Sequence, residues 1–347
     1  MARRVTIQDI ADELGLSRNT VSKAINNTGI LADSTRETIL QKAIEMGYKQ
    51  FSYVSEALLP LPGSAATIAV LTCGFLDTSH FASITLDSFQ RELSHLGYGL
   101  TIYSVSLQEL ETCSLPASFS PNAICGIICF EIFDPSYSDM ICNLGLPTLF
   151  VDGPSPYRGF QLKSNCLLME NRTNIYAFVK EMVARRKKRI GFIGDYRHCM
   201  SFYERYMAYR EALIMFGIPC EDAYCLLGNS DDDPSPQKYE KYIKKFLQKT
   251  KELPDVFICA NDFVAFDTMQ AFKELHISVP DDVYLCGFDD SPESRIVTPP
   301  LTTIHIHHEI MGFAAVHLLM ARIKDPQPYY NTTYTETSLI YRGSTGD

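Results

Sequence analysis

From Thr67 onward the chain alternates short apolar runs with longer stretches of helical periodicity, and this alternation limits the possible folds most strongly. Short apolar runs between turn residues are typical of buried strands, and apolar residues three and four positions apart are typical of helices. The alternation predicts parallel sheets with helices on both faces. The expected strands are Ile68–Thr72, Leu100–Val105, Gly126–Phe130, Thr148–Val151, Arg189–Ile193, Val256–Ala260, Val283–Gly287 and Thr303–Ile306, and the clearest helices are Ile84–Leu96, Asn174–Arg185, Glu204–Phe216, Tyr239–Lys251 and Phe263–Leu275.

The strands fall into two series, which predicts an α/β core of two doubly wound parallel-sheet subdomains within residues 67–347. We expect an N-subdomain at about 67–162 and 292–322, and a C-subdomain at about 163–291 and 323–347. Ligands of such sheets bind outside the carboxyl ends of the strands, so a cleft between the halves is expected. Thr78, Ser79 and Phe81 follow the first strand and are candidates to line that cleft.

The first fifty residues have the pattern of three short helices. Thr6 is a cap for the first helix, which Gly15 ends, and Ser17 is a cap for a second helix from Arg18 to about Ile25. A third helix starts with a capping box after residue 33. Two helices joined by a short turn with glycine predict a helix-turn-helix motif, so this part is expected to be a small all-α head.

The second helix of such a motif enters the DNA major groove, where its exposed side chains contact base edges. Arginine and lysine suit guanine, asparagine suits adenine, and hydroxyl or amide groups suit phosphate oxygens. A small helical bundle with a polar second helix is the alternative. The base-reading candidates are Arg18, Asn19, Ser22 and Lys23, and the phosphate candidates are Thr6, Ser17, Thr20 and Asn26.

Two separate sets of motifs identify a family. The head carries Thr6-Ile7-x-Asp9-Ile10-Ala11 followed by Leu14-Gly15-Leu16-Ser17-x-x-Thr20-Val21-Ser22-Lys23, and it resembles the head of the lactose/galactose repressor (LacI/GalR) family. The C-terminal half is similar to the sensor core of that family. Its matching motifs are Arg189–Gly194, Asn261-Asp262-x-x-Ala265, Val279–Val283, Gly287–Asp290, Pro300–Ile304 and Tyr341–Ser344.

The resemblance implies a homodimeric transcriptional regulator, usually a repressor, that binds a near-palindromic double-stranded DNA operator. Its core would resemble periplasmic binding proteins and bind a small effector, with Arg205, Asp262 and Asp152 as contacts. A sugar or sugar derivative is the expected effector, while a nucleobase or a protein corepressor remains open. The direction of the ligand's effect on DNA binding also remains open. Asp289 and Asp290 are expected to shape a turn rather than to contact the ligand.

The linker at residues 51–66 departs from the family. Members usually follow the head with Pro-Asn and a short hinge helix, whose leucine enters the minor groove and kinks the operator. This chain lacks the Pro-Asn, and only Ala57 and Leu58 stand near the leucine position. The departure predicts weaker bending of the operator, or a different coupling between effector and DNA.

Other classes of protein are disfavoured by the sequence. There is no phosphate-binding glycine loop, no Gly-x-Ser-x-Gly and no identifiable nucleophile–base set, so no enzyme activity, cofactor or catalytic residue is expected. The histidine-rich segment 305–309 lacks a second ligand pair, and we expect no metal site. Without a membrane-length apolar run or a secretory signal, a cytoplasmic location is expected. A sugar-binding protein with a vestigial head is the main alternative.

Overall fold

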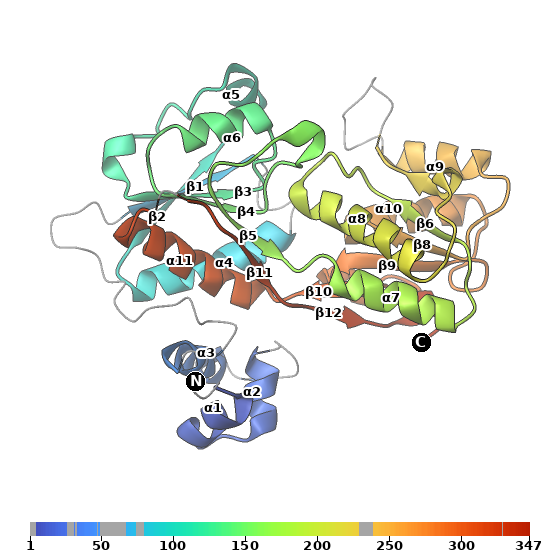
Figure 1. The fold of residues 1–347 in the computed structure, drawn as a ribbon, viewed down its shortest axis with the longest axis horizontal. Coiled ribbons are helices and arrows are strands. Elements are labelled where there is room, and N and C mark those ends of the chain that lie inside the picture. Colours follow the sequence, from blue (N-terminus) through green and yellow to red (C-terminus); the bar gives the residue numbers. More distant parts are fainter. Residues whose placement is uncertain are drawn as a thin grey trace. The chain divides into compact units, whose positions relative to one another are not determined.

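The computed structural model describes residues 5–25, 31, 33–46, 48, 67–73, 80–228, 239–327 and 329–347. The candidates Asn26, Ala57, Leu58, Thr78 and Ser79 lie outside these residues. The chain divides into two compact units, each built from several segments (Figure 1). The first unit comprises Met1–Asp152, Leu162–Leu168 and His307–Thr335, and the second comprises Gly153–Gln161, Met169–Ile306 and Glu336–Asp347.

Three helices form the head: α1 (Ile7–Leu14), α2 (Arg18–Ile25) and α3 (Asp33–Glu45). The predicted helix-turn-helix is therefore present. At the start of α1, the Thr6 hydroxyl accepts a hydrogen bond from the Asp9 amide, and the Asp9 carboxylate accepts one from the Thr6 amide. Gly15 ends α1 with a φ of 64°, a left-handed conformation in which a side chain is disfavoured.

A shared apolar cluster holds the three head helices together and extends to α11 (His308–Lys324). Ile310 and Phe313 of α11 pack against the same cluster as the head residues. Beside it, Arg36 Nη1 lies 3.3 Å from Glu309 Oε1. The head residues buried in the cluster are Ile10, Ala11, Val21, Ala24, Ile25, Ile39, Leu40 and Ala43.

The first unit contains a six-stranded sheet, among the described residues, in the order β11-β5-β4-β3-β1-β2. The pairings of β1 with β2 and β3, of β3 with β4, and of β4 with β5 are parallel. Within this unit, α4 and α11 pack together on one face of the sheet, and α6 lies on the other (Figure 1). The elements are β1 (Thr67–Thr72), α4 (His80–His95), β2 (Gly99–Ser104), α5 (Leu107–Thr112), β3 (Gly126–Phe130), α6 (Pro135–Cys142), β4 (Thr148–Val151), β5 (Asn165–Met169) and β11 (Thr332–Thr335).

The second unit contains, over its described part, another six-stranded sheet in the order β12-β10-β9-β8-β6-β7. Its pairings are parallel except for β10 with β12, which is antiparallel. Helix α7 packs against α8, and α9 packs against α10. The elements are α7 (Thr173–Ala184), β6 (Ile190–Ile193), α8 (Met200–Met215), β7 (Cys225–Leu226), α9 (Tyr239–Lys249), β8 (Val256–Cys259), α10 (Asp262–Glu274), β9 (Tyr284–Asp289), β10 (Thr302–Ile306) and β12 (Thr337–Ile340).

The architecture confirms the predicted α/β fold class, but the segment boundaries need a correction. Strand β10 pairs with β9, so the chain leaves the second unit after Ile306 and not after residue 291. It returns to the second unit at Glu336 and not at residue 323. In the sequence between β4 and α7, residues 153–161 belong to the second unit. Residues Leu162–Leu168 belong to the first unit, where β5 pairs with β4. None of the described helices is both long and apolar enough to cross a membrane.

Candidate functional site

Helix α2 begins with a hydrogen-bonded pair of hydroxyl groups. The Thr20 amide donates to Ser17 Oγ at 3.0 Å, which caps the first turn. The Ser17 and Thr20 hydroxyl oxygens are 2.7 Å apart, so one hydroxyl donates to the other. Only one of the two hydroxyl hydrogens is used in this pair. The other is left to reach a phosphate oxygen, as the phosphate prediction for these residues requires.

The polar and apolar sides of α2 are cleanly separated. Val21, Ala24 and Ile25 are buried, whereas Arg18 and Asn19 are exposed in the first turn. The remaining base-reading candidates, Ser22 and Lys23, are partly exposed on the same helix. The side chains that can meet base edges thus lie within the first six residues of a helix whose start is fixed by its cap.

Thr6 has a role inside the head that competes with its predicted contact to phosphate. Its hydroxyl donates to Asp9 Oδ2 at 2.7 Å, and its amide donates to the same oxygen at 2.8 Å. Because a hydroxyl has only one hydrogen, Thr6 can donate to a phosphate only by giving up this bond.

In the second unit, Arg205 of α8 lies at the carboxyl end of the sheet. The residue is 2% exposed, and its Nε donates to Asn171 Oδ1 at 2.9 Å. Its Nη1 donates to the carbonyl of Ala260, just beyond β8, at 2.7 Å. The guanidinium carbon stands 3.4 Å from the centre of the Phe288 ring, a close cation–π contact. Arg205 is therefore a fixed cation at the strand ends and not a surface residue of its helix.

Asp289, the last residue of β9, adds a carboxylate beside this cation. Its Oδ1 lies 3.7 Å from Arg205 Nη1. The backbone φ of Asp289 is 118°, a conformation that costs a non-glycine residue roughly 1–3 kcal/mol and that clusters at functional sites. Sequence reasoning assigned Asp289 only to a turn and did not consider Asn171 or Phe288. The motif Gly287–Asp290 was the signal that could have found Asp289 and Phe288.

Asp262, the predicted ligand carboxylate, is instead held by donors within its own unit. It is fully buried; Oδ1 accepts a hydrogen bond from the Thr303 hydroxyl at 2.6 Å, and Oδ2 accepts one from the Ser291 amide at 2.8 Å. Burial raises the pKa of Asp262 to about 7, although both hydrogen bonds oppose the shift. Gly287 makes room for it, since a Cβ there would stand 2.2 Å from Asp262 Oδ1. The structure thus gives Asp262 a positioning role beneath the strand ends.

Asp290 fixes the turn after β9, as expected. Its carboxylate accepts hydrogen bonds from Arg342 at 2.5 Å, from Arg295 at 2.7 Å, from His305 at 3.1 Å and from the Ser294 hydroxyl at 3.1 Å. Burial alone would raise its pKa, but these donors hold the pKa of Asp290 well below its usual range. Asp290 is therefore a structural anion that anchors the loop following Asp289.

The remaining ligand candidates belong to the first unit. Asp152 directly follows β4, where it has a φ of 58° and its amide donates to the Leu167 carbonyl at 3.0 Å. Phe81 lies in the first turn of α4. Asp152 thus lies at the carboxyl end of β4, and Phe81 comes after β1 in the chain.

The histidine-rich segment 305–309 forms separate structural contacts. His305 bonds Asp290, and His308 Nδ1 lies 3.1 Å from the Thr85 hydroxyl in the first unit. Across the described part of the chain, no group of three or more His, Cys, Asp or Glu side chains is arranged to hold a metal ion.

Comparison with known proteins gives two family matches that follow the two parts of the fold. The model described as bacterial regulatory proteins of the lacI family matches residues 6–50, and the periplasmic binding protein-like domain matches residues 179–345. The head is thus similar to the LacI family, and the C-terminal half is similar to the periplasmic binding protein-like domain. Together with the chain's relatives, the matches confirm a DNA-binding transcriptional regulator with a ligand-binding core, and not an enzyme.

Similar proteins extend over nearly the whole chain. The repressor PurR of Photobacterium profundum is 23% identical over 99% of both chains, and the regulator GalR of Lacticaseibacillus casei is 29% identical over 98% of this chain and 99% of its own. Among solved structures, the regulator CelR in complex with cellobiose has a TM-score of 0.69 at 21% identity, covering 98% of this chain and all of the other. The Lac repressor dimer bound to operator and the anti-inducer ONPF has a TM-score of 0.66 at 21% identity, covering 99% of each chain. Both structures share the fold of this chain.

Proposed function

We propose that this protein is a homodimeric cytoplasmic repressor of the LacI family that reads a near-palindromic operator and releases or tightens it when a sugar or sugar derivative binds its core. In this proposal, residues 1–50 are the DNA-binding head, 51–66 the linker and 67–347 the ligand-binding core. The observation that carries it is the capped helix α2, which presents exposed Arg18 and Asn19 opposite a buried apolar side.

Base reading is assigned to α2 by the chemistry of its exposed side chains. Arg18 would donate a bidentate pair to guanine O6 and N7, and Asn19 would pair with adenine N6 and N7. Ser22 and Lys23 would support these contacts from the following turn. Contacts to phosphates, which position the head without specifying sequence, would come from the hydroxyl and amide group at the helix starts and ends, Thr6, Ser17, Thr20 and Asn26.

Ligand binding is assigned to the strand ends around Arg205. A guanidinium donates hydrogen bonds in a fixed geometry and a carboxylate accepts them, so Arg205 and Asp289 together match hydroxyl groups that do both. Asp152 and Phe81 are the candidates from the first unit, together with Thr78 and Ser79, and Asp262 would support the site from below. Two solved relatives of the same fold hold sugars, cellobiose in one and ribose in another, which supports a carbohydrate.

Selection of genomic fragments on the purified full-length protein, followed by anisotropy titration at several salt concentrations, tests the DNA-binding half. We expect a near-palindromic site bound far more tightly than random DNA. Arg18→Ala and Asn19→Ala should each relax specificity at a defined base by ~1–3 kcal/mol. Arg210→Ala, an exposed arginine of α8, is the matched control and should leave the titration unchanged. Equal weakening on every DNA sequence would contradict the base-reading assignment.

A panel of sugars, sugar phosphates and nucleobases, screened by thermal shift and then by its effect on operator affinity, tests the ligand-binding half. Arg205→Lys keeps the charge but loses the planar fork, so we expect ligand affinity to fall at least about tenfold. Arg210→Lys on the same helix is the control. Stabilisation by a nucleobase and by no carbohydrate would overturn the sugar assignment and leave the DNA-binding half standing.

A further inference from the structure

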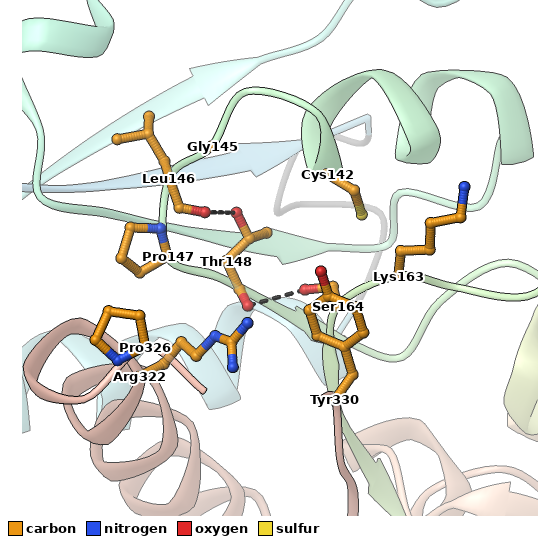
Figure 2. Close-up of a pocket in the computed structure, with 10 residues that line it drawn as sticks. All are labelled: Cys142, Gly145, Leu146, Pro147, Thr148, Lys163, Ser164, Arg322, Pro326 and Tyr330. Atoms are coloured by element: carbon orange, nitrogen blue, oxygen red, sulfur yellow. Dashed lines mark hydrogen bonds between the residues drawn. The ribbon is translucent and has the colours of Figure 1, made fainter. Parts of the chain in front are cut away.

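A pocket lies in the first unit, away from the strand ends assigned to the ligand. It encloses about 200 Å³ between the start of β4, the start of β5 and the segment after α11 (Figure 2). Strands β4 and β5 are parallel, so their starts share one edge of the sheet, opposite the edge where Asp152 follows β4. Because β1 runs parallel to β3, and β3 to β4, this is also the edge at which Thr67 begins the sheet after the linker.

The lining of this pocket is cationic, although the chain has an excess of acidic residues, 41 against 31 Lys and Arg. Arg322 and Lys163 line it, and none of the other described residues of the lining carries a carboxylate. Among the described residues, neither cation forms an ion pair. Two cations that share a pocket repel each other, so an arrangement without a neutralising carboxylate favours an anionic ligand.

Arg322 is held in place by its own segment. Its Nη1 donates to the carbonyls of Gln327 and Tyr329, and its guanidinium lies 5.1 Å from the centre of the Tyr330 ring. Figure 2 shows the guanidinium inside the pocket, near Thr148 and Ser164, whereas the Lys163 side chain stands at the rim. A guanidinium anchored through one nitrogen presents its other N–H groups in a fixed geometry, which suits a tetrahedral oxyanion.

The neutral groups of the lining do not supply a competing negative charge. The Ser164 hydroxyl donates to the Thr148 carbonyl at 2.8 Å, and the Thr148 hydroxyl donates to the Leu146 carbonyl at 2.9 Å. Burial, with the negative charge of Asp139 as a smaller cause, raises the pKa of the Cys142 thiol to about 11. The thiol therefore stays neutral at physiological pH, and Arg322 and Lys163 set the charge of the pocket.

We propose that this pocket is a second ligand site, which binds a phosphate group, either free inorganic phosphate or the phosphate of a small metabolite. Arg322 holds two of the phosphate oxygens with its fork, and Lys163 closes over it from the rim. A pocket of this volume admits the phosphate group and a few further atoms. Its volume is smaller than that of typical sites for small molecules. The site is independent of the sugar proposal, since it uses other residues at the opposite edge of the sheet.

Isothermal titration of the full-length protein with inorganic phosphate, at an ionic strength kept constant with potassium chloride, tests the proposal. We expect one phosphate per chain. Arg322→Gln should weaken binding at least about tenfold, because it removes a charge-assisted pair of hydrogen bonds. Lys163→Gln should weaken it severalfold, and Lys180→Gln, an exposed lysine of α7, should change nothing.

Two further measurements keep the outcome decisive. Arg322 also donates to two backbone carbonyls, so a thermal melt must show that Arg322→Gln is folded. Lys163 lies at an exposed rim position, so Lys163→Gln tests the site without a risk to folding. Glycerol phosphate, titrated in parallel, binds more tightly than inorganic phosphate if the natural ligand is a phosphorylated metabolite, and less tightly if it is free phosphate. Absence of binding at about 10 mM phosphate, or equal binding by all variants, would overturn the proposal. Neither result would affect the operator titration.

Discussion

Replacing the buried carboxylate of Asp262 with an amide tests how the core holds its strand ends. Burial raises the pKa of Asp262 to about 7, far above its value in an unfolded chain. The folded state therefore retains a proton that the unfolded state has already lost, and the free energy of unfolding falls as the pH rises from about 4 to about 7. Above that range the full cost of ionising the buried group is present.

The magnitude follows from the pKa in the two states. We compare Asp262 with a side chain that stays neutral in both the folded and the unfolded state. Relative to that reference, Asp262 is expected to lower the free energy of unfolding by about 2 kcal/mol at pH 5 and by about 4 kcal/mol at pH 8. Asp262→Asn does not titrate and keeps a similar shape, and its amide can donate to the Thr303 hydroxyl while its oxygen accepts from the Ser291 amide. The difference in free energy of unfolding between the variant and the parent protein should therefore grow by about 2–3 kcal/mol in favour of the variant as the pH rises from 5 to 8.

Urea unfolding of both full-length proteins across this pH range measures the effect. All other titrating groups are common to the two chains, so their contributions cancel in the difference. Asp281→Asn, at an exposed position, is the matched control and should follow the parent curve at every pH. If Asp262→Asn and the parent protein have parallel curves, Asp262 ionises in the folded protein as it does in water, and the reasoning from burial is wrong.

Two further predictions concern the turn after β9 and the linker. Asp290→Asn leaves Arg295 and Arg342 without their buried anion and should lower the free energy of unfolding by ~3 kcal/mol at pH 7 in urea titration. The donors lower the pKa of Asp290, so the ionised side chain stabilises the fold above the pKa of the unfolded chain, and this stabilisation is lost as the pH falls. The difference in free energy of unfolding between the parent protein and Asp290→Asn should therefore narrow below about pH 4. A difference that widens there would contradict the assignment. In permutation gels on the selected operator, the parent protein should show no sharp central kink and Leu58→Ala should migrate like it; a kink that Leu58→Ala abolishes would contradict the reading of the linker.

The head could be predicted almost completely because its signals are local. Thr6 and Asp9 lie three residues apart and form the expected capping box, and Gly15 adopts the left-handed conformation that ends α1. Ser17 caps α2 through the amide three residues later. Each of these contacts involves neighbours in the sequence, so the residue types alone determine it.

Most of the predicted core strands are buried on both faces, although the exposed strand β2 was also predicted and the buried strand β5 was missed. Every residue of Gly126–Phe130 is buried, and its uninterrupted apolar run predicted β3. Strand β12 is only partly buried, and its pattern gave no signal. Its antiparallel pairing with β10 and the crossing after Ile306 depend on contacts between segments distant in sequence. Periodicity carries no information about such pairing.

The choice between two acids at the candidate ligand site shows the same limit. Sequence reasoning favoured Asp262, which follows the cap of α10, and assigned Asp289 to a turn. In the structure Asp289 is the acid that faces Arg205, whereas Asp262 bonds Thr303 and the Ser291 amide. Both acids follow apolar strands and both occur in family-like motifs. Their orientations depend on which neighbouring strand offers a donor, and that information lies elsewhere in the chain.

Asp262 nevertheless matters for the ligand site, because of what it connects. It begins α10, bonds Thr303 of β10 and the loop after β9, and lies against Gly287 within β9. A single buried carboxylate thus links three elements at the edge where Arg205 and Asp289 lie. Hydrogen-bonded acceptors of this kind fix relative positions more tightly than apolar contacts do, because their geometry is directional. Asp262 therefore lowers stability at neutral pH while it holds the residues of the ligand site in position. Asp262→Asn separates these two effects, because stability and ligand affinity can be measured on the same variant.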